Sequence, residues 1–349
     1  MKKRTTALLL LIFTLISVLS SCDSKLPDIT PKNKQYYEYF NTVSVIYSYA
    51  GDTDEAFLEN CNTVEEILRD YHKLFDIYYK YSGINNLKTV NENAGKSPVK
   101  VDSRLIDFLE YSKEMYTLTD GAVNIALGSV LKLWHDARDA ASISEDLAYV
   151  PDMEELEAAM EHTDINNIII DRENSTVFIS DPKLSIDVGA IGKGYATEKA
   201  RCALIEKGVT SYVLNIGGNI SAIGTKVSGA PWRTSIKSPH KAGEYALTVD
   251  LANTSCVTSG DYERYFTIDG VKYHHIIDQI TLMPAAYFSS ITIITPDSAL
   301  ADALSTALFC MSYEDGLKLA SSLEGVDVYW IGTDGTEYMT QGIKDIISD

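Results

Sequence analysis

The sequence predicts a single α+β domain in which helices and antiparallel strands follow one another in mixed order. Two stretches in its first third carry apolar residues at helical spacing, and the later part contains short runs typical of strands and hairpins. No tandem repeat, low-complexity tract or second long apolar span interrupts this pattern. We therefore expect one folded unit over residues 36–349, after a signal peptide at 1–21 and a tether at 22–35.

The N-terminus has the features of a bacterial lipoprotein signal peptide. Basic residues at 2–4 precede an apolar run at 7–18, and small residues come directly before Cys22. Cleavage before Cys22 leaves a cysteine that carries lipid in such proteins, and two or more acyl chains anchor a protein stably. We expect a lipid-anchored protein on the extracytoplasmic face of the cell membrane. A plain secretory signal with a chance cysteine at its end is the alternative.

Composition and charge narrow the classes of partner. With 45% hydrophobic and 23% charged residues, the chain has the composition of a globular protein, which excludes disorder as its main state. A formal net charge of -19 excludes nucleic acid as a partner, because nucleic-acid binding needs a cationic surface. The remaining cysteines fit no metal or redox motif, and we expect most of them to be buried thiols. They are Cys61, Cys202, Cys256 and Cys310.

Helices are expected at 63–79 and 103–118, where apolar residues recur every three or four positions. Thr63 and Ser103 are the predicted N-caps. Two hairpins are expected, one at 168–180 with its turn at Asn174 and one near the C-terminus around 334–335. Further strands are predicted at 211–216, 246–251 and 289–295.

The stretch SIDVGAIGKGYATEKA at 185–200 places three glycines before a predicted helix. It is not a phosphate-binding P-loop, because Asp187 stands where that motif needs glycine, and its glycine spacing does not fit a dinucleotide fingerprint. Its glycines still let a ligand approach the backbone, Lys193 adds a cation, and a helix from about Tyr195 offers N–H groups to an anion. The alternative is a turn whose glycines serve helix packing.

The stretch TPDSALADALSTALF at 295–309 predicts a helix, with Asp297 or Ser298 as its N-cap. Asp302 and Thr306 are four positions apart and therefore share a helical face. Their oxygen donors suit Mg²⁺ better than Zn²⁺, which prefers histidine and cysteine. The alternative is that both are ordinary helix residues, with Asp302 in a solvated first turn.

The stretch KYHHIIDQ at 272–279 contains two adjacent histidines. If the chain is extended there, His274 and His275 point to opposite faces and do not form a metal-binding pair. One of them titrates near neutral pH and can stabilise a phosphate. The alternative for either is a solvated histidine on a hairpin.

These motifs together resemble the FAD:protein FMN transferase family, the ApbE-type flavin transferase lipoproteins. The resemblance spans nearly the whole mature chain, from about Tyr39 to beyond Thr306. The motifs lie in the family order and at family-like separations. They are INNLKTVN, LTDGAVNIALGSVLKLW, SIDVGAIGKGYATEKA, NIGGNISAIG, TSGDYERYF, HHIIDQ and ADALSTALF.

The resemblance implies a reaction and its partners. Members of the family bind FAD, use Mg²⁺ and transfer FMN to a Ser or Thr hydroxyl of a target protein, releasing AMP. The acceptor implied is an exported electron-transfer subunit or another flavoprotein. Two alternatives stay open: an FAD pyrophosphatase that yields FMN and AMP, and a non-catalytic lipoprotein that binds flavin.

The resemblance also implies site residues. Magnesium would be held by the side chains of Asp302 and Thr306 and by the backbone carbonyl of Ala190. His275 would handle a proton or stabilise a phosphate, and Asp302 is the other candidate base, although a metal-bound carboxylate is a weaker one. The residues expected to contact FAD are Tyr78 (or Tyr81), Ala122, Val123, Asn124, Asp187, Lys193 and, through its backbone, Ile277.

Three departures from the family pattern bear on the site. The segment 279–283 intervenes before Pro284, where the family commonly has a proline and a glycine turn. Asn124 stands where some members have aspartate, and Ser305 where some have an acidic metal ligand. With fewer carboxylates, metal binding would be weaker. The resemblance implies that members with altered metal sites hydrolyse FAD, so hydrolysis is the second hypothesis after transfer.

Overall fold

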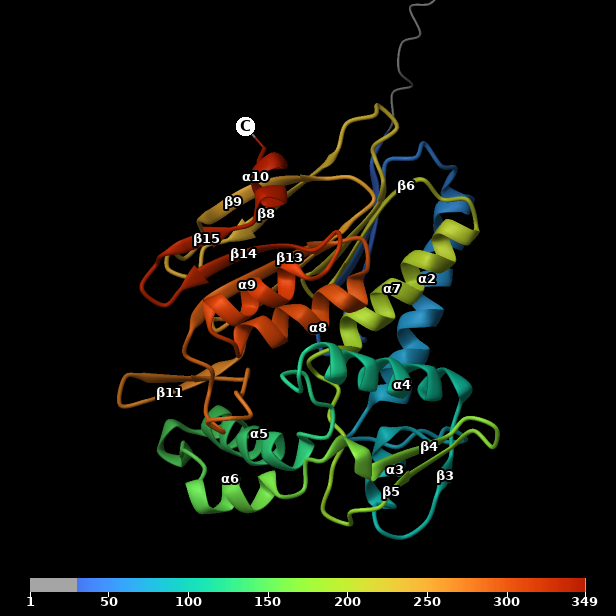
Figure 1. The fold of residues 1–349 in the computed structure, drawn as a ribbon. Helices are drawn as coiled ribbons and strands as arrows, with labels where there is room; N and C mark the ends of the chain where they lie inside the picture. The colour runs from blue at the N-terminus through green and yellow to red at the C-terminus, as the bar shows by residue number, and fades with distance from the viewer. Residues whose placement is uncertain (1–29, 349) are drawn as a thin grey trace, which may run out of the picture.

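An eight-stranded sheet is the centre of the computed structural model, which describes residues 30–348 (Figure 1). The strand order is β1-β2-β6-β7-β10-β13-β14-β15, and every neighbouring pair is antiparallel. The strands are β1 (Lys32–Tyr36), β2 (Ser44–Ser48), β6 (Ser211–Ile216), β7 (Asn219–Gly224), β10 (Ser255–Gly260), β13 (Phe288–Thr295), β14 (Asp327–Gly332) and β15 (Glu337–Met339).

Both faces of this sheet are covered, so its interior strand β13 is buried along its whole length. All eight residues of β13 are buried, which fits a strand packed on both sides. Ile291 and Ile293 pack with helix residues such as Leu304, whereas Ile294 packs on the opposite face with Trp232. The covering elements are α2 (Asp54–Phe75), α7 (Gly192–Glu206), α8 (Ser298–Phe309) and α9 (Tyr313–Ser321) on one face, and β8 (Trp232–Lys237), β9 (Tyr245–Leu251) and α10 (Gln341–Asp345) on the other.

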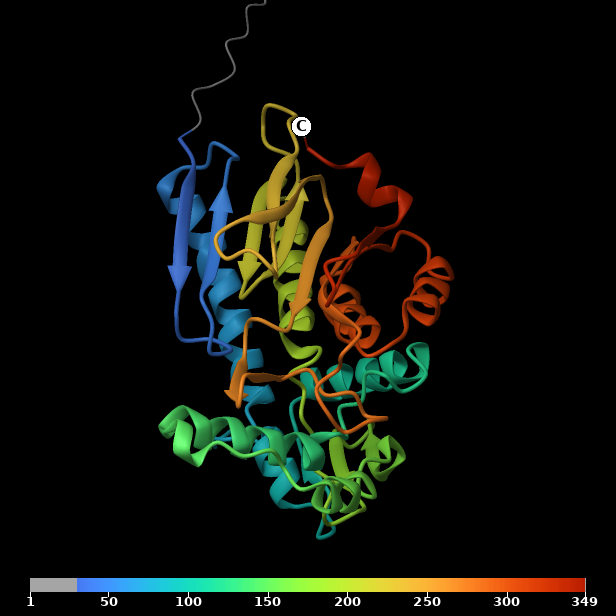
Figure 2. The same ribbon diagram turned by 90° about the vertical axis from the view of Figure 1, so that its left-hand side faces the viewer.

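A second, smaller group of elements lies below the large sheet (Figures 1 and 2). An aromatic cluster connects the two groups: Phe75 of α2 lies 4.1 Å from Phe108, and Phe108 lies 5.0 Å from Tyr195 of α7, between ring centroids. The elements of this group are α3 (Leu87–Glu92), β3 (Val99–Lys100), α4 (Ser103–Leu118), α5 (Gly128–Ile143), α6 (Met153–Met160), β4 (Ile168–Asp171), β5 (Thr176–Ile179), β11 (Tyr265–Ile268) and β12 (Val271–His274), with 3₁₀ turns at Glu145–Leu147 and Ile165–Asn167.

Most of the elements predicted from the sequence are confirmed, including the α+β class. The predicted helix at 103–118 is α4, and the predicted hairpins are β4–β5 and β14–β15. The strands at 211–216, 246–251 and 289–295 correspond to β6, β9 and β13. The helix in 295–309 is α8, and Asp297 is its N-cap.

Three helix ends differ from the prediction. Helix α2 begins nine residues before Thr63, and Thr53 is its N-cap; Thr63 lies inside the helix. The helix also ends before the predicted Tyr79, because Asp76 has an extended backbone. The N-cap of α4 is Asp102 rather than Ser103, since the Asp102 carboxylate accepts a hydrogen bond from a first-turn N–H. At both N-termini a better capping group lay outside the apolar pattern used to set the boundary.

The N-terminal predictions lie mostly outside the described residues. Cys22 and the signal peptide at 1–21 are outside residues 30–348. The end of the predicted tether is part of a strand, because Lys32–Tyr36 forms β1, which pairs with β2. This strand has few apolar residues, so no hydrophobic alternation marks it in the sequence.

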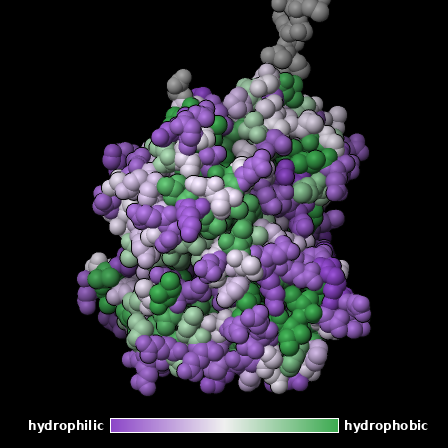
Figure 3. Space-filling view, in the orientation of Figure 1, coloured by the Kyte–Doolittle hydropathy of each residue, from purple (hydrophilic) through white to green (hydrophobic). Residues whose placement is uncertain are grey.

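Within residues 30–348, no helix is both long enough and apolar enough to cross a bilayer. The surface in the view of Figure 1 is mostly hydrophilic, with hydrophobic atoms in separate clusters (Figure 3). Three of the four predicted thiols are buried, Cys202 is partly exposed, and all four are unpaired. The expectation of free thiols that are mostly buried is therefore confirmed.

Helix α7 packs unusually close to its neighbours because it begins with glycines. A Cβ on Gly194 would lie 2.3 Å from Asp302 Cβ and 2.4 Å from Ser298 O of α8, and one on Gly192 would lie 3.2 Å from the Phe75 ring. These distances leave no room for a side chain at Gly194. Gly194 therefore serves helix packing, which was one of the two interpretations of the glycine stretch. This packing brings α8 against the N-terminus of α7.

We predict that Gly194→Ala lowers stability, because the added methyl group forces α7 and α8 apart. Overpacking of this kind typically costs about 1–3 kcal/mol in the free energy of unfolding, which urea unfolding measures. The matched control is Gly316→Ala in α9, where the new Cβ would meet Leu308 at an ordinary 3.4 Å. Equal stability of the two variants would contradict the close crossing.

Candidate active site

Asp302 of α8 is the centre of the site. It is 3% exposed, and its carboxylate accepts a hydrogen bond of 2.7 Å from the backbone N–H of Gly194. Its other oxygen lies 3.4 Å from Lys193 Nζ. The N-cap residue of α7 provides no side-chain hydrogen bond, so Asp302 satisfies one of the free N–H groups at this helix end. The solvated first-turn position considered for Asp302 is therefore wrong.

Thr306 lies one turn further along α8 and meets the glycine stretch. Its hydroxyl lies 3.4 Å from the backbone carbonyl oxygen of Ala190, as a weak hydrogen bond. A carboxylate, a hydroxyl and a carbonyl thus converge from two segments more than a hundred residues apart. All are hard oxygen donors, so their chemistry fits Mg²⁺.

Within residues 30–348, no three His, Cys, Asp or Glu side chains lie close enough together to hold a metal ion. An ion bound beside Asp302 therefore depends on hydroxyl, carbonyl, substrate or water oxygens for its other ligands. Ser305 does not face this set: its buried hydroxyl contacts Asp302 O and Ser259 Oγ instead. Ser305 thus serves the contact with β10.

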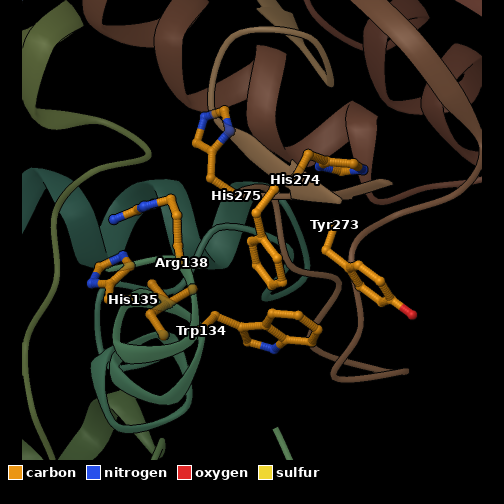
Figure 4. Close-up of a pocket in the computed structure, with 8 residues that line it drawn as sticks. Trp134, His135, Arg138, Tyr273, His274 and His275 are labelled. Atoms are coloured by element: carbon orange, nitrogen blue, oxygen red, sulfur yellow. The ribbon is translucent and has the colours of Figure 1, made fainter. Parts of the chain in front are cut away.

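The two adjacent histidines point in different directions, as predicted (Figure 4). His274 is buried, with Nε2 2.9 Å from Ala285 O and Nδ1 accepting from Ile276 N. His275 follows the end of β12, and its Nδ1 is buried without a hydrogen-bond partner. His274 is thus a satisfied structural histidine, whereas His275 has a ring nitrogen available to a ligand.

Positive groups surround His275. Burial is the main reason that its pKa falls from 6.5 to about 3, and Arg264, His274, Lys193 and Arg138 lower it further. The imidazole is therefore neutral at physiological pH. Because the histidine is neutral, the positive charge around it comes from lysine and arginine side chains. These side chains favour a polyanionic ligand such as a diphosphate.

Asp187 lies on the other side of the glycine turn and contacts two elements. It is buried, and its Oδ1 accepts a hydrogen bond from Gly189 N. Its Oδ2 lies 3.9 Å from His135 Nδ1 of α5. The same His135 nitrogen lies 3.2 Å from the hydroxyl of Tyr78. A tyrosine, a histidine and a carboxylate therefore form one connected group.

The contacts of Tyr78 and Tyr81 differ. Tyr78 reaches His135, whereas the Tyr81 hydroxyl donates to Asp76 Oδ2 over 2.7 Å, on the side of His72. Of the two tyrosines left open by the sequence, Tyr78 is the one directed toward Asp187.

The segment 122–124 lies beside Asp187, since Asp187 N donates to Ile125 O. The Asn124 side chain is occupied within the loop: its amide donates to Thr163 O and its oxygen accepts from Ala126 N. Val123 is buried, and Ala122 is partly exposed. This segment offers backbone and small side chains to a ligand, rather than the amide of Asn124.

The segment 279–283 contacts this loop and α5. Gln279 donates to the carbonyl of Gly121 over 2.6 Å, and Trp134 donates to Leu282 O over 3.0 Å. The Ile277 carbonyl accepts a weak bond from the Cys310 thiol. The 279–283 segment therefore ties the strand end after His275 to the loop at 121–124 and to α5.

Three residues near His275 were not singled out from the sequence. His135 and Arg138 lie three positions apart on one face of α5 and line the same pocket as His275 (Figure 4). Arg264 directly precedes β11, and its backbone carbonyl accepts a hydrogen bond from His275 N. The available signal was a histidine directly after Trp134 with an arginine three positions further on, at helical spacing. Without the fold, nothing connects it to His275.

Comparisons with known proteins agree with one another. The family model described as ApbE family matches residues 40–330. The FAD:protein FMN transferase of Treponema pallidum is 36% identical over 274 residues, which cover 74% of each chain. The Escherichia coli (strain K12) protein of the same name is 27% identical over 272 residues, covering 77% of this chain and 75% of that protein.

Solved structures give the same result. The ApbE protein of Thermotoga maritima superposes with a TM-score of 0.80 at 28% identity, covering 92% of this chain and all of that one. The flavin transferase ApbE of Vibrio cholerae has a TM-score of 0.73 at 25% identity, covering 91% of this chain and 100% of that one.

We predict that the protein loses stability as the pH falls below 6.5, because burial lowers the pKa of several histidines in the folded state. The unfolded chain then binds protons that the folded chain does not, so acid favours unfolding. Thermal unfolding at about pH 7.5 and about pH 5.5 measures the effect, and His275→Asn should reduce the slope. A melting temperature that is constant over this range would contradict the prediction. The histidines concerned are His72, His135, His274 and His275.

Proposed function

Because the chain belongs to the ApbE family, we propose that it is an FAD:protein FMN transferase that acts on an exported acceptor protein. It binds FAD as substrate, transfers FMN to a Ser or Thr hydroxyl with the help of Mg²⁺, and releases AMP. The observation that carries the proposal is the convergence of Asp302, Thr306 and the Ala190 carbonyl beside Lys193.

Asp302, Thr306 and Ala190 are the residues that would hold magnesium. When bound, Mg²⁺ neutralises charge on phosphate oxygens and fixes their orientation. The protein's own contribution is to fix these donors through the α7–α8 contact. Gly194 N holds the Asp302 carboxylate, and the glycine turn before α7 presents the Ala190 carbonyl to Thr306.

The chemical step exchanges one phosphorus–oxygen bond for another. The acceptor hydroxyl oxygen bonds to the phosphorus of the FMN half, and the bond from that phosphorus to the bridging oxygen breaks. The bridging oxygen leaves with AMP, and the hydroxyl proton passes to a base or to water. Catalysis of such a step rests mainly on positioning and on charge stabilisation.

His275 is the best-placed group for the proton. Its unpartnered Nδ1 belongs to a neutral ring, so it can accept a proton from a hydroxyl. With a pKa of about 3 it is a weak base until an anion offsets the positive charges of Arg264, Lys193 and Arg138. A bound diphosphate provides that anion, which ties the basicity of His275 to the presence of substrate.

Incubation of the purified protein with FAD, Mg²⁺ and a candidate acceptor, followed by mass spectrometry, tests the proposal. We expect the acceptor to gain the mass of FMN and AMP to appear in equal amount. Free FMN with AMP would instead identify a pyrophosphatase, and unchanged FAD would identify a binding protein. Either result would refute the transferase function.

Two variants belong in the same experiment. Asp302→Asn keeps the shape of the side chain and can still accept a hydrogen bond from Gly194 N, but it removes the negative charge. We expect the rate of FMN transfer to fall by about two orders of magnitude and to need more Mg²⁺.

His275→Ala should lower the rate of transfer by about 10²–10⁴-fold while FAD still binds. A His275→Ala variant that transfers FMN at the parental rate would end the role of His275.

We further propose that the mature protein is anchored by lipid on Cys22 at the extracytoplasmic face of the cell membrane. The basic segment, apolar run and small residues that precede Cys22 support this. A Cys22→Ser protein should appear in the soluble fraction without lipid label. Retention of label and of membrane association by that variant would contradict the anchor.

A further inference from the structure

We propose that His135 is a positioning residue that holds the Tyr78 ring at the FAD site and links it to the glycine turn through Asp187. The inference rests on the proposed function, because it takes the ligand beside Tyr78 to be FAD. It concerns a residue outside the expected magnesium set and outside the contacts that the resemblance implies.

Tyr78 needs an external contact to stay in place. Its side chain is 55% exposed, and it lies in a short loop after α2. Asp76 holds Tyr78 through the backbone alone, by accepting a hydrogen bond from the Tyr78 N–H. The hydrogen bond between the Tyr78 hydroxyl and His135 therefore holds the ring itself, which would otherwise sample several rotamers.

His135 is suited to this contact because α5 holds it rigidly. It belongs to the second turn of a sixteen-residue helix, directly after the buried Trp134, whose indole N–H is bonded to Leu282 O. Its side chain is 22% exposed. Burial lowers the pKa of His135, so the ring is neutral near pH 7 and one of its two nitrogens carries the proton. Its Nδ1 lies 3.2 Å from the Tyr78 hydroxyl, and the tautomer decides which of the two atoms donates.

The same nitrogen connects Tyr78 to the turn before α7. His135 Nδ1 lies 3.9 Å from Asp187 Oδ2, and Asp187 Oδ1 accepts from Gly189 N, next to Ala190. The chain of contacts therefore runs from an exposed aromatic ring to the segment that presents the Ala190 carbonyl. A displacement of His135 changes the position of the ring relative to this turn.

The other residues of α5 favour a role at the site over a purely structural one. Arg138, on the same face, lies between His135 and His275 in Figure 4. Trp134, Phe266 and Tyr273 form the aromatic base below them, with Trp134 and Tyr273 stacked at 6.0 Å between ring centroids. Structural packing is thus supplied by the aromatic residues, while His135 and Arg138 point toward the candidate site.

A double-mutant cycle on FAD affinity tests the inference. The variants are Tyr78→Phe, His135→Phe and the pair combined, with binding followed by flavin fluorescence and folding checked by thermal unfolding. Loss of one hydrogen bond corresponds to about a three- to tenfold weaker Kd. We expect each single variant to show this loss and the double variant to show about the same loss, because one contact is removed in all three.

Matched variants separate positioning from general damage. His135→Asn keeps a hydrogen-bonding amide close to the Nδ1 position and should restore much of the affinity. His240→Phe is the control, because it alters a histidine bonded to Gly332 O on β14. This control should leave the Kd for FAD unchanged.

The outcomes are distinct. Additive losses in the double variant, or a Kd for His135→Phe equal to that of His240→Phe, would overturn the role of His135 while leaving the transferase function intact. Failure of the parental protein to bind FAD at all would refute the proposed function and, with it, this inference.

Discussion

The hydrogen bond between Gly194 N and the Asp302 carboxylate is the contact on which the rest of the site depends. It closes the N-terminus of α7 with a side chain from α8, and it forms only because Gly194 has no Cβ to separate the two helices. Once the helices cross there, Thr306 and the Ala190 carbonyl meet one turn away, and Lys193 lies against Asp302. The close packing of α7 against α8 therefore also sets the positions of the groups expected to bind the ligand.

Charge is distributed unevenly around this contact. The chain carries a net charge of -19, yet Lys193, Arg138 and Arg264 gather around a neutral His275. A local positive field in an acidic protein directs a polyanion to one place, because the remaining surface repels it. Burial keeps His275 neutral until such a ligand arrives. The same burial that lowers its pKa in the free protein thus makes its proton affinity responsive to substrate.

The lower group of elements completes the site from the opposite side. Helix α5 brings His135 and Arg138 toward the glycine turn, and the 279–283 segment ties the end of β12 to the loop at 121–124. The side-chain amide of Gln279 holds the loop in position through its hydrogen bond to the carbonyl of Gly121.

By itself, the sequence determined the α+β class, the helix with Asp302 and Thr306 on one face, and the divergence of His274 and His275. Each follows from local periodicity, which a linear chain displays. Local periodicity did not predict the N-cap of α2 at Thr53 or the strand β1, because caps and polar edge strands lack an apolar pattern. Only the tertiary structure decided that His135 and Arg138 belong near His275 and that Gly194 serves packing, because those roles depend on contacts between residues far apart in the chain.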